Sequence, residues 1–195
     1  MTLGVFTADR AGKFAVITNG GSTCEAGRTA TALCSPPILA NSGKWSVTLK
    51  IDQTVSSGGL LDIGMVDAMN VKLNNGTSWE NWAVTMVCNG TLTARGDDTD
   101  GGRFNEGDVV TLSFDSDAKL LRFIRGDDEL QRYQFEAYEP HGWCFAVSSG
   151  GQATVVGSQA GTAQAVHGHA RVEGLNTLLE AFATRASDAK LMCFD

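Results

Sequence analysis

The sequence has little proline, no run of basic residues and no long apolar stretch. Three prolines against 23 glycines in 195 residues predict many tight turns and few stiff linkers. Lys and Arg number 15 against 22 Asp and Glu, which gives a formal net charge of −7. Binding to nucleic acid through phosphates needs clustered Lys and Arg, so we expect no nucleic-acid partner.

Targeting and membrane signals are also missing. The first residues, MTLGVFTADR, lack the basic and apolar regions of a secretory signal. No stretch approaches the roughly 18 apolar residues that a membrane-spanning helix needs. These absences predict an intracellular, cytoplasmic protein that does not associate with a membrane.

The cysteines follow no metal-binding or disulfide pattern. Cys24, Cys34, Cys88, Cys144 and Cys193 make an odd number without C-x-x-C spacing. A zinc site and a disulfide framework are therefore not expected in a chain without an export signal. We expect all of these thiols to be reduced.

Motifs for catalysis are absent as well. The chain contains no G-x-S-x-G elbow, phosphate-binding loop or H-E-x-x-H pair, and His141, His167 and His169 do not form a catalytic set. The acidic stretch 97–101 does not match a calcium-binding loop, because Arg103 stands where glycine is required, and predicts a solvated loop. We therefore expect no enzyme, cofactor or metal, although a triad assembled only in space would escape this search.

What the sequence does contain is alternation of apolar and polar residues, the period of a β-strand with one wet face. It runs through 45–51, 82–88 and 110–114, and shorter apolar runs occur at 14–18, 60–66, 120–124, 143–148 and 153–156. Turn pairs such as Asn89-Gly90 separate these segments. Many short strands without a helical period before residue 160 predict an all-β protein, a two-sheet antiparallel sandwich or jelly roll.

The pattern changes near Gly157. We expect a sandwich domain over 1–157, a linker of small residues over 158–171 and an amphipathic helix over 172–195, where Leu175, Leu178, Leu179 and Phe182 follow helical spacing. The helix could cover a sheet face or edge of its own sandwich, or dock on a partner.

The order of short motifs between about Lys13 and Gly157 resembles that of a SPRY (B30.2-type) domain. The motifs are Ser35–Leu39 with Gly43–Trp45, Asp62–Val66, Ser78-Trp79 with Asn89-Gly90, Gly107–Val110 with Asp115–Asp117 and Leu121–Phe123, and Ala146–Ser148. Ser46–Thr48, Arg125-Gly126 and Phe145 depart from the family's usual residues, so no subfamily is assigned. The resemblance implies a concanavalin-like sandwich and a non-catalytic protein-interaction module with binding loops at one end.

The resemblance also implies where a partner would bind. It implies a shallow pocket formed by loops from separate parts of the chain, which lie around Thr23–Glu25, just before Leu60, between Asn70 and Thr77, and just after Ala146–Ser148. They select Thr23, Glu25, Gly59, Asn70, Lys72, Asn74, Asn75, Ser149, Gly151 and Gln152 as partner-binding residues. This polar, glycine-rich set suits an extended polar peptide or a partner surface.

Two other functions fit the same fold class. Jelly rolls also serve as lectins, and Trp79 beside Asn74 and Asn75 could stack on a sugar ring. The chain could also be a permanent subunit of a larger assembly, in which case the C-terminal helix would need its partner.

Overall fold

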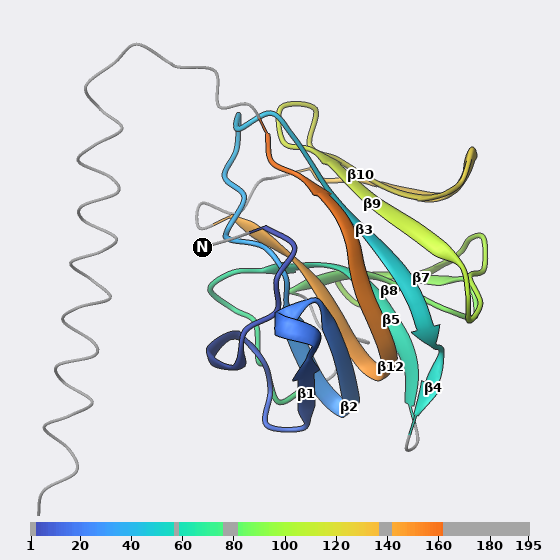
Figure 1. Ribbon diagram of the computed structural model, residues 1–195. Coiled ribbons are helices and arrows are strands. Elements are labelled where there is room, and N and C mark those ends of the chain that lie inside the picture. The colour runs from blue at the N-terminus through green and yellow to red at the C-terminus, as the bar shows by residue number, and fades with distance from the viewer. Residues whose placement is uncertain (1–2, 57–58, 76–81, 137–141, 162–195) are drawn as a thin grey trace, which may run out of the picture. The chain divides into compact units, whose positions relative to one another are not determined.

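Twelve β-strands form nearly all the regular structure in the computed structural model, which describes residues 3–56, 59–75, 82–136 and 142–161 (Figure 1). The strands are β1 (Ala15–Thr18), β2 (Thr23–Leu33), β3 (Lys44–Gln53), β4 (Val55–Ser56), β5 (Gly59–Asp67), β6 (Ala83–Val87), β7 (Thr91–Ala94), β8 (Asp97–Asp100), β9 (Val109–Asp115), β10 (Leu120–Arg125), β11 (Asp128–Gln134) and β12 (Trp143–Gln159). The helices of this part of the chain are the 3₁₀ turns η1 (Ala8–Arg10) and η2 (Asn19–Gly21), and neither could cross a bilayer.

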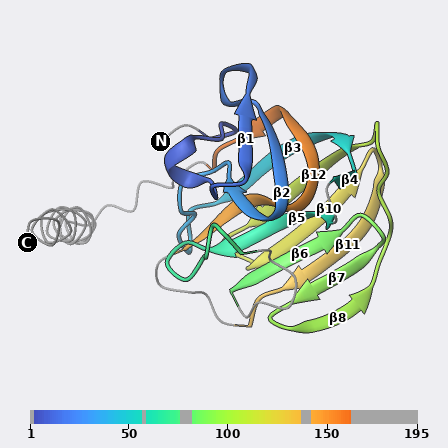
Figure 2. The same ribbon diagram turned by 90° about the horizontal axis from the view of Figure 1, so that it is seen from below.

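The long strand β12 holds the antiparallel sheet together. One edge of β12 pairs with β2, while the other edge pairs first with β5 and then, beyond Gly150, with β3. The strands then follow the order β11-β10-β9-β3-β12-β5-β6-β7-β8. The sheet curls at β12, so that its two halves face each other as the layers of a sandwich (Figure 2). The all-β sandwich that the sequence predicts is confirmed, with one strand shared by both layers.

The apolar faces of the two halves meet in one core. Val47, Leu49 and Ile51 of β3 contribute to the same buried cluster as Ile63 of β5 and Met86 of β6. In β9 the burial alternates residue by residue, as its sequence predicts. This half of the sandwich, formed by β3, β9, β10 and β11, has an outer side that we call the open face.

In the other half, the central strands β5 and β6 are buried on both sides. Every residue of β5 from Leu61 to Asp67 is buried, and so is the whole of β6. A second apolar cluster lies on the outer side of these strands, where Ala68, Val71 and Leu73 pack against buried residues that include Val66 and Cys144. We call the outer side of β2, β5, β6 and residues 143–149 of β12 the covered face, because the segment 68–75 lies over it.

Some segments differ from the sequence-based expectations. The runs 143–148 and 153–156 belong to a single strand, β12. The acidic stretch expected to be a solvated loop forms β8, an exposed edge strand that pairs with β7. Ser158 and Gln159, expected in the linker, still belong to β12, while the rest of the linker from 162 and the helix at 172–195 lie outside the described residues.

Candidate functional site

The partner-binding residues expected from the sequence lie mostly on strands rather than on loops. Thr23 and Glu25 belong to β2, Gly59 begins β5, and Ser149, Gly151 and Gln152 belong to β12. The expectation of loops at these positions is wrong, and only Asn70, Lys72, Asn74 and Asn75 lie in a loop. Thr23, Ser149 and Gly151 are buried, whereas Gly59 and Gln152 are partly exposed, and Glu25 and the four loop residues are exposed.

Ser149, Gly150 and Gly151 lie where β12 changes partner from β5 to β3. A Cβ atom on Gly150 would come within 2.6 Å of the Gly59 Cα atom, so the close approach of the two strands requires glycine. Ser149 has a left-handed φ of 72°, and its Oγ donates a hydrogen bond to Asp62 Oδ2 at 2.8 Å. Both side chains are buried, so this hydroxyl supports the structure and is not offered to a partner.

The strand pair on the far side of Gly150 presents two polar side chains. Glu25 of β2 and Gln152 of β12 are opposite each other in the pairing register. Their neighbours Cys24 and Ala153 point into the core, which places Glu25 and Gln152 on the outer side. Thr23, in contrast, is held by Thr154, whose Oγ1 lies 2.9 Å from its own Oγ1.

The segment 68–75 is held at both ends by hydrogen bonds. At its start, Oδ1 of the buried Asp67 accepts from the Met69 N–H at 2.8 Å, and Asp67 Oδ2 accepts from Asn70 Nδ2 at 2.8 Å. At its end, the Thr31 N–H donates to the Leu73 carbonyl at 2.8 Å and Thr31 Oγ1 donates to the Asn75 carbonyl at 2.9 Å. The loop therefore presents its exposed side chains from a fixed backbone.

Together these residues form an elongated strip instead of a pocket. Asn70 is bonded to Asp67 at the end of β5, while Gly59 lies at its beginning, and a nine-residue strand spans about 26 Å at roughly 3.3 Å per residue. The loop returns along the covered face, because Asn75 bonds to Thr31, which in turn bonds to Ser148 of β12 at 2.8 Å. We define the strip as Asn70, Lys72, Asn74, Asn75, Gly59, Glu25 and Gln152.

The structure shows no reactive thiol or metal cluster in the residues that it describes. Cys24, Cys34, Cys88 and Cys144 are free and buried. Burial raises the pKa of Cys24 to about 12 and that of Cys144 to about 11, and it also raises the pKa values of Cys34 and Cys88. Such thiols stay protonated near pH 7, so none of the four is an activated nucleophile. Within these ranges no group of three His, Cys, Asp or Glu residues could hold a metal ion.

Comparison with known proteins identifies the fold. No family model and no curated protein matches the sequence. The SPRY domain of human HERC1 superposes with a TM-score of 0.62 at 18% identity, over 77% of this chain and 96% of that domain. A second human SPRY domain gives a TM-score of 0.55 at 17% identity over 73% and 94%, and the TRIM65 PSpry domain gives 0.59 at 9% identity over 78% and 88%. The chain has the SPRY-domain fold.

Several of the motifs that suggested the SPRY fold lie in strands of this domain. Asp62–Val66 lies in β5, Leu121–Phe123 in β10 and Ala146–Ser148 in β12, while Asp115–Asp117 leads from β9 into the turn before β10. Trp82 is buried, whereas Trp79 and the histidines lie outside the described residues.

Sequence reasoning missed the residues that hold the strip in place. Thr31, Asp62 and Asp67 are buried polar residues, and each bonds to a partner-binding residue or its backbone. The available signal was a single polar residue inside or directly after an apolar run, as at Asp62 and Asp67.

Proposed function

We propose that this SPRY-fold chain is a non-catalytic protein-binding module that holds an extended, polar peptide along the strip. The solved domains with this fold bear the SPRY name, and the strip has the length and polarity that an extended peptide backbone requires. The protonated, buried thiols give no support to covalent catalysis by the four cysteines described.

The loop amides carry the proposal. Asn70 uses its Nδ2 group to bind Asp67, and among the described residues its Oδ1 has no protein partner. Asn74 does the opposite: its Oδ1 accepts from the Lys13 N–H at 2.8 Å, and its Nδ2 has no partner in the same set of residues. One anchored amide thus offers an acceptor and the other a donor, the two groups that a peptide backbone alternately needs.

The experiment compares Asn74→Asp with Asn89→Asp. Both asparagines are exposed and accept a backbone N–H through Oδ1, since Asn89 Oδ1 binds the Thr91 N–H at 3.0 Å in the turn between β6 and β7. Each substitution keeps that acceptor, removes the same donor and adds the same charge, but only Asn74 lies on the strip. Peptides are selected from a displayed random library on the full chain, and binding of the best one is measured by calorimetry.

We expect Asn74→Asp to weaken that peptide by about 1–3 kcal/mol through the lost hydrogen bond, with Asn89→Asp unchanged. Equal binding to both variants would contradict the proposal, as would a library that yields no peptide. Saturable binding on a glycan array in place of peptide binding would favour the lectin function instead.

A further inference from the structure

The open face carries an arrangement of charge that folding alone does not favour. Arg122 of β10 and Arg132 of β11 are directly opposite each other in the pairing register. Like charges in this position destabilise an antiparallel pair. A single carboxylate, that of Glu129, lies near both guanidinium groups, 3.6 Å from Arg122 Nε on one side and close to Arg132 Nε on the other. Two arginines therefore share one counter-charge.

A shallow pocket adjoins these arginines. It has a volume of about 140 Å³ and is lined by Lys44, Ser113, Asp115, Ala118, Leu120 and Arg122. The register explains this set, because Lys44 pairs with Asp115 and Asp115 with Leu120, while Ser113 pairs with Arg122. Three adjacent strands thus bring two cations and a hydroxyl group to one place on the outer side of the sheet.

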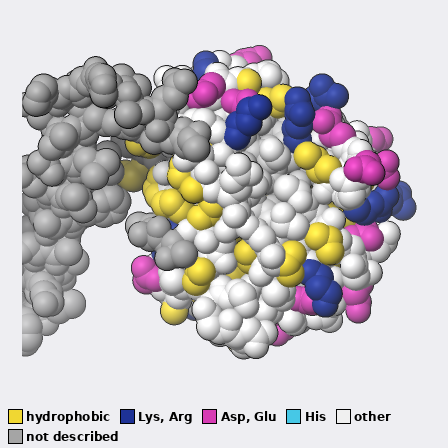
Figure 3. Space-filling model, turned by 45° about the horizontal axis from the view of Figure 1, so that its top comes forward, with side chains coloured by type: hydrophobic (Ala, Val, Ile, Leu, Met, Phe, Trp, Pro, Cys, Tyr) yellow, Lys and Arg dark blue, Asp and Glu magenta, His cyan; other side chains and the backbone are white. Residues whose placement is uncertain are grey.

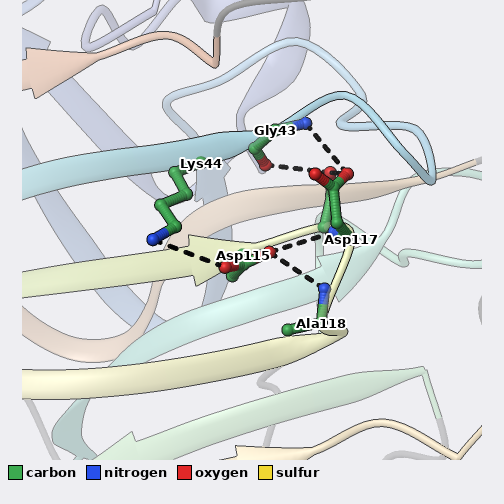
Figure 4. A network of polar contacts seen from close by, with 6 residues as sticks. Gly43, Lys44, Asp115, Asp117 and Ala118 are labelled. Carbon is green, nitrogen blue, oxygen red and sulfur yellow. Dashed lines mark hydrogen bonds and ion pairs between the residues drawn. The ribbon is translucent and has the colours of Figure 1, made fainter.

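The acid in the pocket does not neutralise Lys44 fully. Asp115 Oδ1 accepts the N–H groups of Asp117 and Ala118 at 3.1 and 2.9 Å, which fixes the turn between β9 and β10 (Figure 4). Its Oδ2 atom lies 3.8 Å from Lys44 Nζ, beyond hydrogen-bond distance. The Lys44 side chain is 78% exposed, so its ammonium group retains the capacity to bind another anion.

Arg122 also retains open donors. Within the described residues it makes no hydrogen bond, and its ion pair with Glu129 spans 3.6 Å. Arg125, three residues further along β10, shows the contrast: its Nη1 donates to the Arg103 carbonyl at 3.1 Å and to Asp108 at 3.3 Å. Arg125 is committed to the fold, whereas Arg122 is 47% exposed and free to form a two-pronged contact.

We propose that this pocket is a second binding site, independent of the strip, which takes a carboxylate side chain from an acidic segment of a partner protein. Lys44 and Arg122 bind the carboxylate oxygens, and the Ser113 hydroxyl donates to them. Leu120 and Ala118 contact the methylene groups of the entering side chain. The negative charge of Asp115 in the wall disfavours a phosphate dianion more than a singly charged carboxylate. A carboxylate can also lie in the plane of the Arg122 guanidinium group and accept two hydrogen bonds from it.

The size of the pocket favours a side chain over a free ligand. Sites for small molecules usually measure about 300–1,000 Å³, and this pocket is well below that range.

In the view of Figure 3, basic and acidic side chains lie beside one another around a centre of uncharged side chains and backbone. The chain as a whole has a net charge of −7 and does not attract acidic segments. Selectivity for an acidic residue therefore depends on the local pair of cations, Lys44 and Arg122.

The test is an NMR titration of the full ¹⁵N-labelled chain at low ionic strength. The probe is a blocked peptide of alternating glycine and glutamate, the matched peptide carries glutamine, and a third titration uses inorganic phosphate. We expect saturable shifts at the amides of Ser113 and Asp115 and at Arg122 Nε with the glutamate peptide. Arg122→Gln and Lys44→Gln should each weaken this binding at least threefold, on the order of an exposed ion pair, while Arg103→Gln leaves it unchanged.

Several outcomes would overturn the proposal. The first is that the glutamine peptide binds as tightly as the glutamate peptide, and the second is that phosphate binds more tightly than the glutamate peptide. The third is that Arg103→Gln, which removes an exposed arginine from outside this face, weakens binding of the glutamate peptide as much as Arg122→Gln does. Asn74→Asp separates the two sites: if it abolishes the shifts, the acidic peptide binds the strip. If it leaves them intact, the pocket stands whether or not the proposed function of the strip does. Far-UV circular dichroism of each variant confirms that the fold is retained.

Discussion

The covered face and the open face belong to one sheet, yet they treat polar side chains in opposite ways. On the covered face, Asp62 is buried against Ser149 and Thr31 against Ser148. On the open face, the hydroxyls of Thr48 and Thr111 bond to each other, but the side chains of Ser113 and Arg122 make no hydrogen bond to another described residue. Burial under the segment 68–75 favours a partner inside the protein for these groups, because an unpaired buried group costs more than a bond gains. Thr85 Oγ1 in β6 is the exception among the described residues, since it is buried without a hydrogen-bond partner. The uncovered groups are left to bind something else.

The largest expected difference between the faces concerns added volume. A Cβ atom at Gly64 in β5 would lie 2.7 Å from the Thr85 Cα atom, a backbone contact that no side-chain rotation can relieve. We expect Gly64→Ala to lower the free energy of unfolding by about 3 kcal/mol. The control on the open face is Ser113→Ala, which ends in the same alanine but removes a hydroxyl group and adds no volume, and it should cost less than about 0.5 kcal/mol. Urea denaturation of both variants measures the difference, and similar midpoints would show that the covered face can open to accept the methyl group.

The next difference concerns a single hydroxyl. Ser149→Ala removes the bond to the buried Asp62 carboxylate and should cost about 2 kcal/mol. Ser149→Gly loses the same bond but relieves the left-handed φ of 72°, so it should be about 1 kcal/mol less destabilising than alanine. On the open face, Thr48→Val breaks a 3.0 Å contact with Thr111 Oγ1 that water can replace, and should change stability by less than about 0.5 kcal/mol. We expect chemical denaturation to show the smallest loss in free energy of unfolding for Thr48→Val, a larger loss for Ser149→Gly and the largest for Ser149→Ala.

The smallest effect depends on pH. All four described cysteines lie in the half of the sandwich with the covered face or at its edge. Cys24 stays protonated up to about pH 12 in the folded chain, whereas its ordinary pKa is 9.0, so above pH 9 the unfolded chain binds fewer protons. The free energy of unfolding therefore falls as the pH rises from 9 towards 12, by about 1 kcal/mol at pH 10 for this thiol.

Cys24→Ala provides the comparison for that effect. In urea titrations at pH 8 and pH 10, the variant should lose less stability than the unchanged chain between the two values. The same four thiols should react with a thiol reagent only in denaturant when Cys193 is replaced by serine. Rapid reaction in the native state would mean that this half of the sandwich opens readily.

Three of the four strands of the half with the open face could be predicted from the sequence, whereas β11 of that half and part of the other half could not. Alternation in 45–51 and 110–114 indicated β3 and β9, because each has one wet side. In β2, small residues such as Ala26, Ala30 and Ala32 are buried, and Leu33 at its end is the only large apolar residue of the strand. Asp97–Asp100 forms β8 although acidic residues are rare in strands, since an exposed edge tolerates them.

The strip was predictable only where its bonds are local. Asp67 and Asn70 are three residues apart, which is the spacing of a turn stabilised by an aspartate. The anchors of Asn74 and Asn75 reach Lys13 and Thr31, 61 and 44 residues away in the sequence, and no local pattern indicates such pairs. Which strip residues bind a partner stays a prediction.

The sharing of β12 between both layers has a consequence for the order of synthesis. β12 is the last described strand to leave the ribosome, yet it pairs with β2, β3 and β5, the earliest of which begins at Thr23. Neither layer can be completed before residues 143–159 have been made, so the nascent chain keeps the edges of three strands unpaired until then. Edges of this kind are where chains associate wrongly, so the risk of misassembly is greatest before β12 has been made.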